Sequence, residues 1–119
     1  MARILIVDDA KFMRAILSGI LVKANHEIVG EGEDGQQAVE LYKKHQPDLV
    51  TMDITMPIMS GLEAVKKIKQ EFPDAKIIMC SAMGKQKMVM EAIEAGAKDF
   101  IIKPFDEIRV NDAIARILN

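Results

Sequence analysis

The sequence lacks tryptophan, has one tyrosine and one cysteine, and contains no long apolar segment. A single thiol, that of Cys80, cannot close a disulfide within the chain. The apolar runs are far shorter than the roughly 20 residues that cross a bilayer. The residues after Met1 also lack the apolar stretch and cleavage site of a secretory signal. These absences predict a cytoplasmic protein that does not enter the membrane.

An excess of charge of one sign is missing as well. Lys and Arg total 16 and Asp and Glu total 18, which gives a formal net charge of -2 at pH 7. This balance provides no general attraction for nucleic acid or an anionic membrane surface. The 119 residues, half of them apolar, have the size of one domain with an ordinary core. We therefore expect a single monomeric domain over residues 1–119, with no output domain and no nucleic-acid partner.

Five short apolar runs rich in β-branched residues predict β-strands. They cover residues 4–7, 27–30, 48–52, 76–80 and 99–103. The first, third, fourth and fifth runs do not alternate polar with apolar residues, which is typical of strands buried on both faces. The second run is more polar, which indicates an edge strand.

The segments between these runs have the spacing of amphipathic helices. The apolar stripe predicted for the first helix comprises Phe12, Met13, Ile16, Leu17, Ile20 and Leu21. Pro47, Pro73 and Gly96 mark the ends of later helices. Strand and helix alternate five times, which predicts an α/β fold with a parallel sheet and helices on both of its faces.

Polar side chains stand at the ends of four predicted strands: Asp8 and Asp9 after the first, Asp53 after the third, Ser81 after the fourth and Lys103 at the end of the fifth. Taken singly, each has an ordinary explanation as a helix cap, a turn residue or a strand-end lysine. Taken together, these side chains indicate a common ligand site, because the carboxyl ends of parallel strands meet at one edge of the sheet, where ligands bind.

Three carboxylates at one edge require compensation. Two of them about 5 Å apart repel each other by roughly 3 kcal/mol at an effective dielectric constant near 20. Either one carboxyl is protonated or a cation lies among them. An oxygen-only donor set favours Mg²⁺, with Mn²⁺ as a substitute, over zinc. We expect Asp8, Asp9, Asp53 and the backbone carbonyl of Thr55 to hold the ion.

A metal, a lysine, a hydroxyl and a free carboxylate together indicate phosphoryl transfer. Asp53 is the best candidate for the nucleophile, because its strand lies between the acid pair and Ser81. Lys103 and Ser81 are then expected to stabilise the oxygens of the transferred phosphoryl group.

Four segments, 7–9, 51–57, 81–84 and 97–105, resemble the receiver domains of two-component response regulators. The resemblance implies a flavodoxin-like fold with strand order 2-1-3-4-5 and phosphorylation of Asp53 by a histidine kinase. It also implies that Ser81 and Phe100 form the conformational switch and that the Lys103–Pro104 peptide is cis. A receiver assists its own phosphorylation and dephosphorylation, so we do not expect an enzyme with a separate substrate.

Within the family, residues 53–57 and 80–84 are most similar to the chemotaxis regulators of the Gram-positive type. This similarity implies that the histidine kinase is CheA and that the phosphorylated form binds the flagellar motor switch protein FliM. The binding face would consist of the fourth helix, the fifth strand and the fifth helix, and a phosphatase is a further expected partner. Phe100 departs from the tyrosine of many such regulators and can signal only by its burial.

Three alternatives remain at this point. A phosphorelay shuttle of the sporulation type would share the whole site but pass the phosphoryl group to a second histidine. A flavin-binding electron carrier would need a hydroxyl-rich loop after the first strand, where this chain has Asp8 and Asp9, and more than 4% aromatic residues. An aspartyl phosphatase of the haloacid dehalogenase type would need its nucleophile after the first strand.

Overall fold

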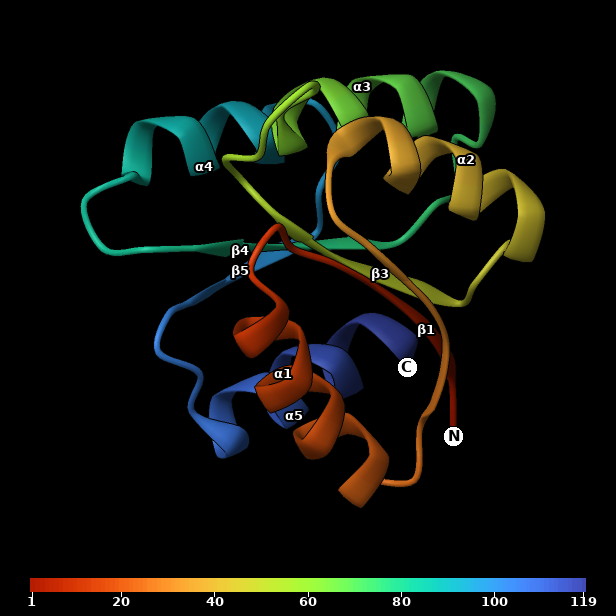
Figure 1. The fold of residues 1–119 in the computed structure, drawn as a ribbon, viewed down its shortest axis with the longest axis vertical. Coiled ribbons are helices and arrows are strands. Elements are labelled where there is room, and N and C mark those ends of the chain that lie inside the picture. The colour runs from red at the N-terminus through yellow and green to blue at the C-terminus, as the bar shows by residue number, and fades with distance from the viewer.

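The computed structural model describes residues 1–119 and contains a five-stranded parallel sheet between two layers of helices (Figure 1). The elements in chain order are β1 (Arg3–Val7), α1 (Lys11–Lys23), β2 (Glu27–Gly32), α2 (Gly35–His45), β3 (Leu49–Asp53), α3 (Gly61–Glu71), β4 (Ile77–Ser81), α4 (Gln86–Glu94), β5 (Asp99–Ile102) and α5 (Glu107–Leu118). The strand order is β2-β1-β3-β4-β5. This topology confirms the predicted α/β fold of the flavodoxin-like type.

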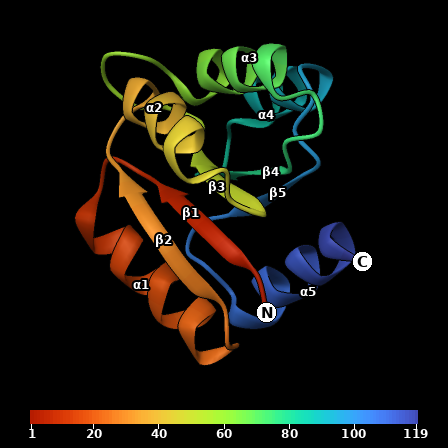
Figure 2. The same ribbon diagram turned by 90° about the vertical axis from the view of Figure 1, so that its right-hand side faces the viewer.

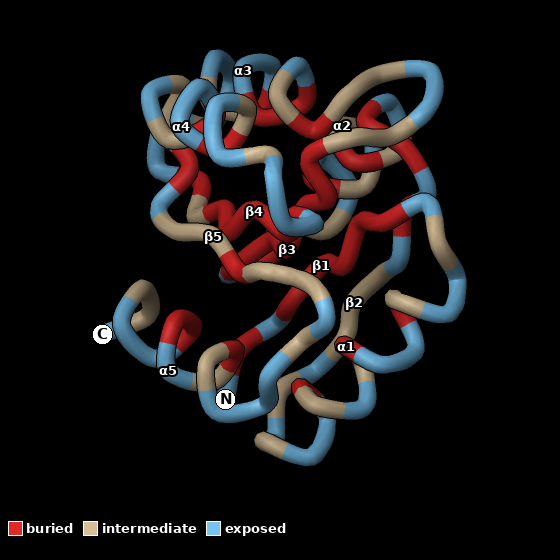
Figure 3. Tube along the Cα trace, turned by 90° about the vertical axis from the view of Figure 1, so that its left-hand side faces the viewer, coloured by how far each residue is buried: buried red, intermediate tan, exposed pale blue.

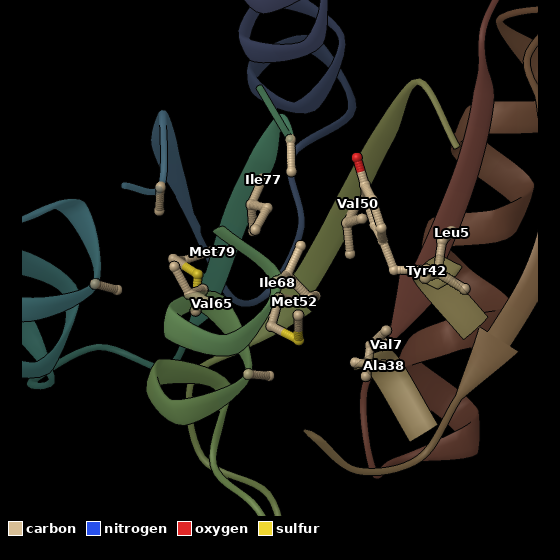
Figure 4. Close-up of a cluster of buried hydrophobic side chains, with 14 of the residues drawn as sticks. Leu5, Val7, Ala38, Tyr42, Val50, Met52, Val65, Ile68, Ile77 and Met79 are labelled. Carbon is tan, nitrogen blue, oxygen red and sulfur yellow. The ribbon is translucent and has the colours of Figure 1, made fainter. Parts of the chain in front are cut away.

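Helices α1 and α5 cover one face of the sheet, and α2, α3 and α4 cover the other (Figures 1 and 2). Each face has its own apolar cluster, one under α2, α3 and α4 and one under α1 and α5. Figure 4 shows side chains of the first cluster, which come from β1, β3 and β4 and from the helices above them. The three central strands are therefore buried on both sides, as the continuous apolar runs predicted.

The two outer strands differ from the central three in burial (Figure 3). The prediction of an edge position is confirmed for β2. The prediction that the fifth strand is buried on both faces is wrong, because β5 pairs only with β4 and its residues Phe100 and Ile102 are half-buried. Phe100 and Ile101 pack against the two apolar clusters on opposite faces, but the edge position leaves Phe100 partly uncovered, which a short apolar run does not reveal.

The stripe predicted for the first helix is only partly correct. Leu17 and Leu21 are buried, but Phe12 is 73% exposed and Ile16 is 37% exposed. At about 100° per residue the apolar positions extend around half of the helix, and only the side through Leu17 and Leu21 faces the sheet. An arginine, Arg14, is buried on that side instead.

Side-chain caps and glycine mark several of the other helix boundaries. Asp34 caps α2 by accepting a hydrogen bond from the Gln37 backbone N–H, and Ser60 caps α3 in the same way. Gly96 follows α4 with a φ of 123°, a conformation that favours glycine. None of the helices combines the length and the apolar character needed to cross a bilayer.

Candidate functional site

The three acids meet at the carboxyl edge of the sheet. Strands β1 and β3 are neighbours, and Val7 is in register with Met52, so Asp8 and Asp53 come next to each other at the ends of these strands. One carboxylate oxygen from each of Asp8, Asp9 and Asp53 lies within 4.8 Å of the others. Asp8 and Asp53 are buried, whereas Asp9 is exposed. The structure thus assembles the acid cluster that the strand ends predicted.

Lys103 lies at the same edge, one residue after β5. Its Nζ is 2.7 Å from Oδ2 of Asp8 and 3.4 Å from Oδ1 of Asp53. Burial opposes the charged ammonium, but the hydrogen bond to Asp8 and the negative charge of Asp53 outweigh it and raise the pKa of Lys103. The lysine therefore stays protonated and bridges the two buried carboxylates.

A single lysine does not neutralise this cluster. Burial and then the charge of Asp8 raise the pKa of Asp53 to about 6, although Lys103 acts in the opposite direction. Near neutral pH the edge therefore holds closely spaced carboxylates with one ammonium among them. An oxygen-only set of this kind, with two buried members and one exposed member, fits a hard divalent cation such as Mg²⁺.

Softer ligands are distant or unreactive. Cys80 is buried in β4, and burial raises the pKa of its thiol to about 12. His26 lies at the opposite edge of the sheet, where its Nδ1 accepts a hydrogen bond from the Ala2 backbone N–H. The donor set at the acid cluster therefore does not suit zinc.

The loop from β3 to α3 approaches the cluster closely. Thr55, whose carbonyl is a predicted ligand, is half-buried two residues after Asp53, and its role as a ligand stays a prediction. The Gly61 N–H donates to the Ile54 carbonyl, and a Cβ at Gly61 would overlap the carbonyl oxygen of Asp53. The sequence carries no signal for this role of Gly61, which lets α3 lie against the backbone of Asp53.

Ser81 and Phe100 meet at a separate place between α4 and β5. Ser81 ends β4, is fully buried and donates its hydroxyl hydrogen bond to the Ala82 carbonyl at 2.8 Å. Together with Phe100, Val89 and Met90 it lines an apolar cavity of about 90 Å³. The structure therefore brings the two predicted switch residues to one cavity and leaves Phe100 outside the acid cluster.

Residues 4–115 match the response regulator receiver domain family. The chain is 64% identical over 117 residues to the chemotaxis protein CheY of Bacillus subtilis, a match that covers 98% of both chains. It is 58% identical to CheY of Thermotoga maritima over 97% of this chain and 96% of that one.

Among solved structures, the CheX-CheY-BeF3-Mg+2 complex from Borrelia burgdorferi contains a chain with a TM-score of 0.93 and 37% identity. That match covers 98% of this chain and 89% of the other. The family match and these likenesses extend over nearly the whole sequence and include all four segments at the strand ends. The chain therefore belongs to the receiver domain family of two-component response regulators and is a signalling protein similar to the chemotaxis regulator CheY.

Proposed function

We propose that this protein is the phosphoacceptor of a chemotaxis pathway, phosphorylated on Asp53 by a histidine kinase of the CheA type. In its phosphorylated form it binds the flagellar motor switch protein FliM. The observation that carries this proposal is the position of Asp53, a buried carboxylate beside Asp8 and within 3.4 Å of the Lys103 ammonium. The identity of 64% with CheY of Bacillus subtilis supports the chemotaxis branch.

In the proposed reaction the Asp53 carboxylate attacks the phosphorus of a phosphohistidine. An O–P bond forms, the N–P bond breaks, and the departing imidazole takes up a proton from solvent. A pKa of about 6 leaves Asp53 mostly ionised at neutral pH, so the nucleophile is in its reactive form. Lys103 keeps its proton and is close enough to turn from the carboxylates to an oxygen of the new phosphoryl group.

Asp8, Asp9, Asp53 and the Thr55 carbonyl would hold magnesium, for which manganese can substitute. When bound, the ion supplies positive charge that stabilises the transferred oxygens. The Borrelia complex contains CheY together with magnesium and BeF3, which supports this cofactor for a similar chain. The cluster also lies at an edge that water reaches through the exposed Asp9, so we expect slow self-hydrolysis but no turnover of a separate substrate.

The cavity between α4 and β5 offers a route from the site to a partner. We propose that Ser81 exchanges the Ala82 carbonyl for a phosphoryl oxygen and that the Phe100 ring then moves into the space of about 90 Å³ beside it. The face formed by α4, β5 and α5 changes its shape as a result and binds FliM. A phosphatase that binds the phosphorylated form is a further proposed partner.

Intact-mass measurement after incubation with acetyl phosphate and Mg²⁺ tests the phosphoacceptor role. We expect one added phosphoryl group, which is lost in Asp53→Asn and suppressed by a chelator. Binding of an N-terminal FliM peptide, measured by calorimetry with and without acetyl phosphate, tests the motor role. No labelling of the wild type contradicts the whole proposal. Labelling without tighter FliM binding, combined with transfer to a second histidine protein, would instead support the phosphorelay shuttle.

A further inference from the structure

Arg14 on α1 is the one basic residue that is buried in the structure, and the proposed reaction does not use it. Its side chain is 8% exposed, although arginine is among the residue types that are rarely buried without a partner. The guanidinium has two firm partners. Nη1 donates to the backbone carbonyl of Asp8 at 2.7 Å, and Nε donates to Oε1 of Glu31 at 3.0 Å. The Arg14 guanidinium therefore connects the loop that carries Asp8 and Asp9 to the end of β2.

Asp9 depends on this loop more than the other two acids do. Asp8 accepts hydrogen bonds from the Ala10 backbone N–H and from Lys103, and Asp53 pairs with Lys103. Asp9 is exposed and accepts no hydrogen bond and forms no ion pair in the structure. The backbone is therefore the only part of Asp9 that the structure holds in place, and it sets the position from which the carboxylate reaches the cluster.

The peptide that joins Asp8 to Asp9 has its carbonyl held by Arg14. The N–H on the preceding side, that of Asp8, donates to the Gly32 carbonyl at 3.0 Å. With both ends of Asp8 fixed, the plane of the following peptide is fixed as well, and so is the Cα of Asp9. We infer that Arg14 is a positioning residue that orients Asp9 as a ligand for the divalent cation. This inference depends on the proposed magnesium site.

The direction in which Arg14→Met changes the Mg²⁺ affinity shows whether Arg14 acts by positioning Asp9 or only through its positive charge. Arg14 carries a positive charge close to the cluster, so its removal alone would strengthen the binding of a cation. Loss of orientation has the opposite effect, because groups that orient metal ligands typically contribute 10- to 100-fold in affinity. Calorimetric titration of Arg14→Met with MgCl₂ is therefore expected to show binding about tenfold weaker than in the wild type. Equal or tighter binding would overturn the inference.

Arg109→Met is the matched control. Arg109 on α5 also joins a carboxylate to a backbone carbonyl, since its Nη2 lies 3.2 Å from Asp99 and donates to the Phe100 carbonyl at 2.8 Å. It makes no contact with the acid cluster. Arg109 is more exposed than Arg14, so we expect a smaller loss of stability, and we expect unchanged Mg²⁺ affinity. An equal fall in affinity in both variants would show a general structural effect and overturn the inference.

A double-mutant cycle tests whether Arg14 acts through Asp9. In an Asp9→Asn background, Arg14→Met is expected to change the Mg²⁺ affinity less than twofold, because the ligand that it orients is already impaired. An additive loss would contradict the inference. If Arg14→Met does not fold, Arg14→Lys replaces it: an ammonium lacks the planar fork, so we expect binding several-fold weaker than in the wild type, and equal binding would overturn the inference.

Wild-type protein without measurable Mg²⁺ binding would refute the proposed function itself. Wild-type binding with an unaffected Arg14→Met variant would refute only the role of Arg14. The two failures are therefore distinguishable in one set of titrations.

Discussion

The amino and carboxyl edges of the sheet differ in how far their charged groups are compensated by partners. At the amino edge the charged groups at the starts of β1 and β3 have partners: the Arg3 N–H donates to Asp48, and the Arg3 guanidinium donates to the carbonyls of His45 and Gln46. At the carboxyl edge three carboxylates share one lysine, and the pKa of Asp53 is raised to about 6. The same strands thus carry a compensated end that stabilises the fold and an uncompensated end that is ready for a cation and a phosphoryl group.

The largest expected effect comes from the tight packing at the carboxyl edge. Gly61→Ala places a Cβ on the carbonyl oxygen of Asp53, so α3 must move and we expect a loss of about 3 kcal/mol or more in the free energy of unfolding. Gly19→Ala is the control, because a Cβ there meets nothing within 4 Å in a helix interior and should stabilise by about 0.5–1 kcal/mol. Urea denaturation measures both. Equal effects would mean that this edge is not closely packed.

The same substitution at the two edges should change stability in opposite directions. Without divalent cations, Asp53→Asn removes a charge that the fold disfavours, and we expect a gain of about 1–3 kcal/mol near neutral pH. Asp48→Asn weakens the bond from the Arg3 N–H and should cost about 0.5 kcal/mol. Both follow from urea denaturation in a chelating buffer. Destabilisation by both variants would show that the acid cluster is compensated already.

The stability difference between Asp53→Asn and the wild type is also expected to depend on pH, by a smaller amount than the effects above. The pKa of Asp53 lies above its ordinary value of 3.8, so the folded state binds this proton more tightly than the unfolded chain. The penalty from this carboxyl is absent below the ordinary value, grows as pH rises and is complete above about pH 6. From about pH 7 to about pH 5, the stability difference between Asp53→Asn and the wild type should therefore shrink by about 1 kcal/mol. Saturating Mg²⁺ should abolish this dependence, and a difference that widens at lower pH would refute it.

The elements that were predicted well are those whose signal is local. The central strands have continuous apolar runs, and their burial on both faces is confirmed. The predictions for Phe12, Ile16 and β5 were wrong for a shared reason. An apolar side chain can be buried, but whether a neighbour covers it depends on the orientation of the helix and on the position of the strand in the sheet.

By itself, the sequence determined the alternation of strands and helices, the sheet edge at which polar side chains gather, and the residue types that could serve a phosphoryl site there. These features follow from short-range periodicity and from the rule that parallel strands end together. Only the tertiary structure decided that Lys103 bridges Asp8 and Asp53, that Gly61 must lack a side chain, and that a buried Arg14 holds the acid loop. Each of these depends on distances between residues far apart in the chain, or on the direction in which one helix faces, and neither is encoded in any local pattern.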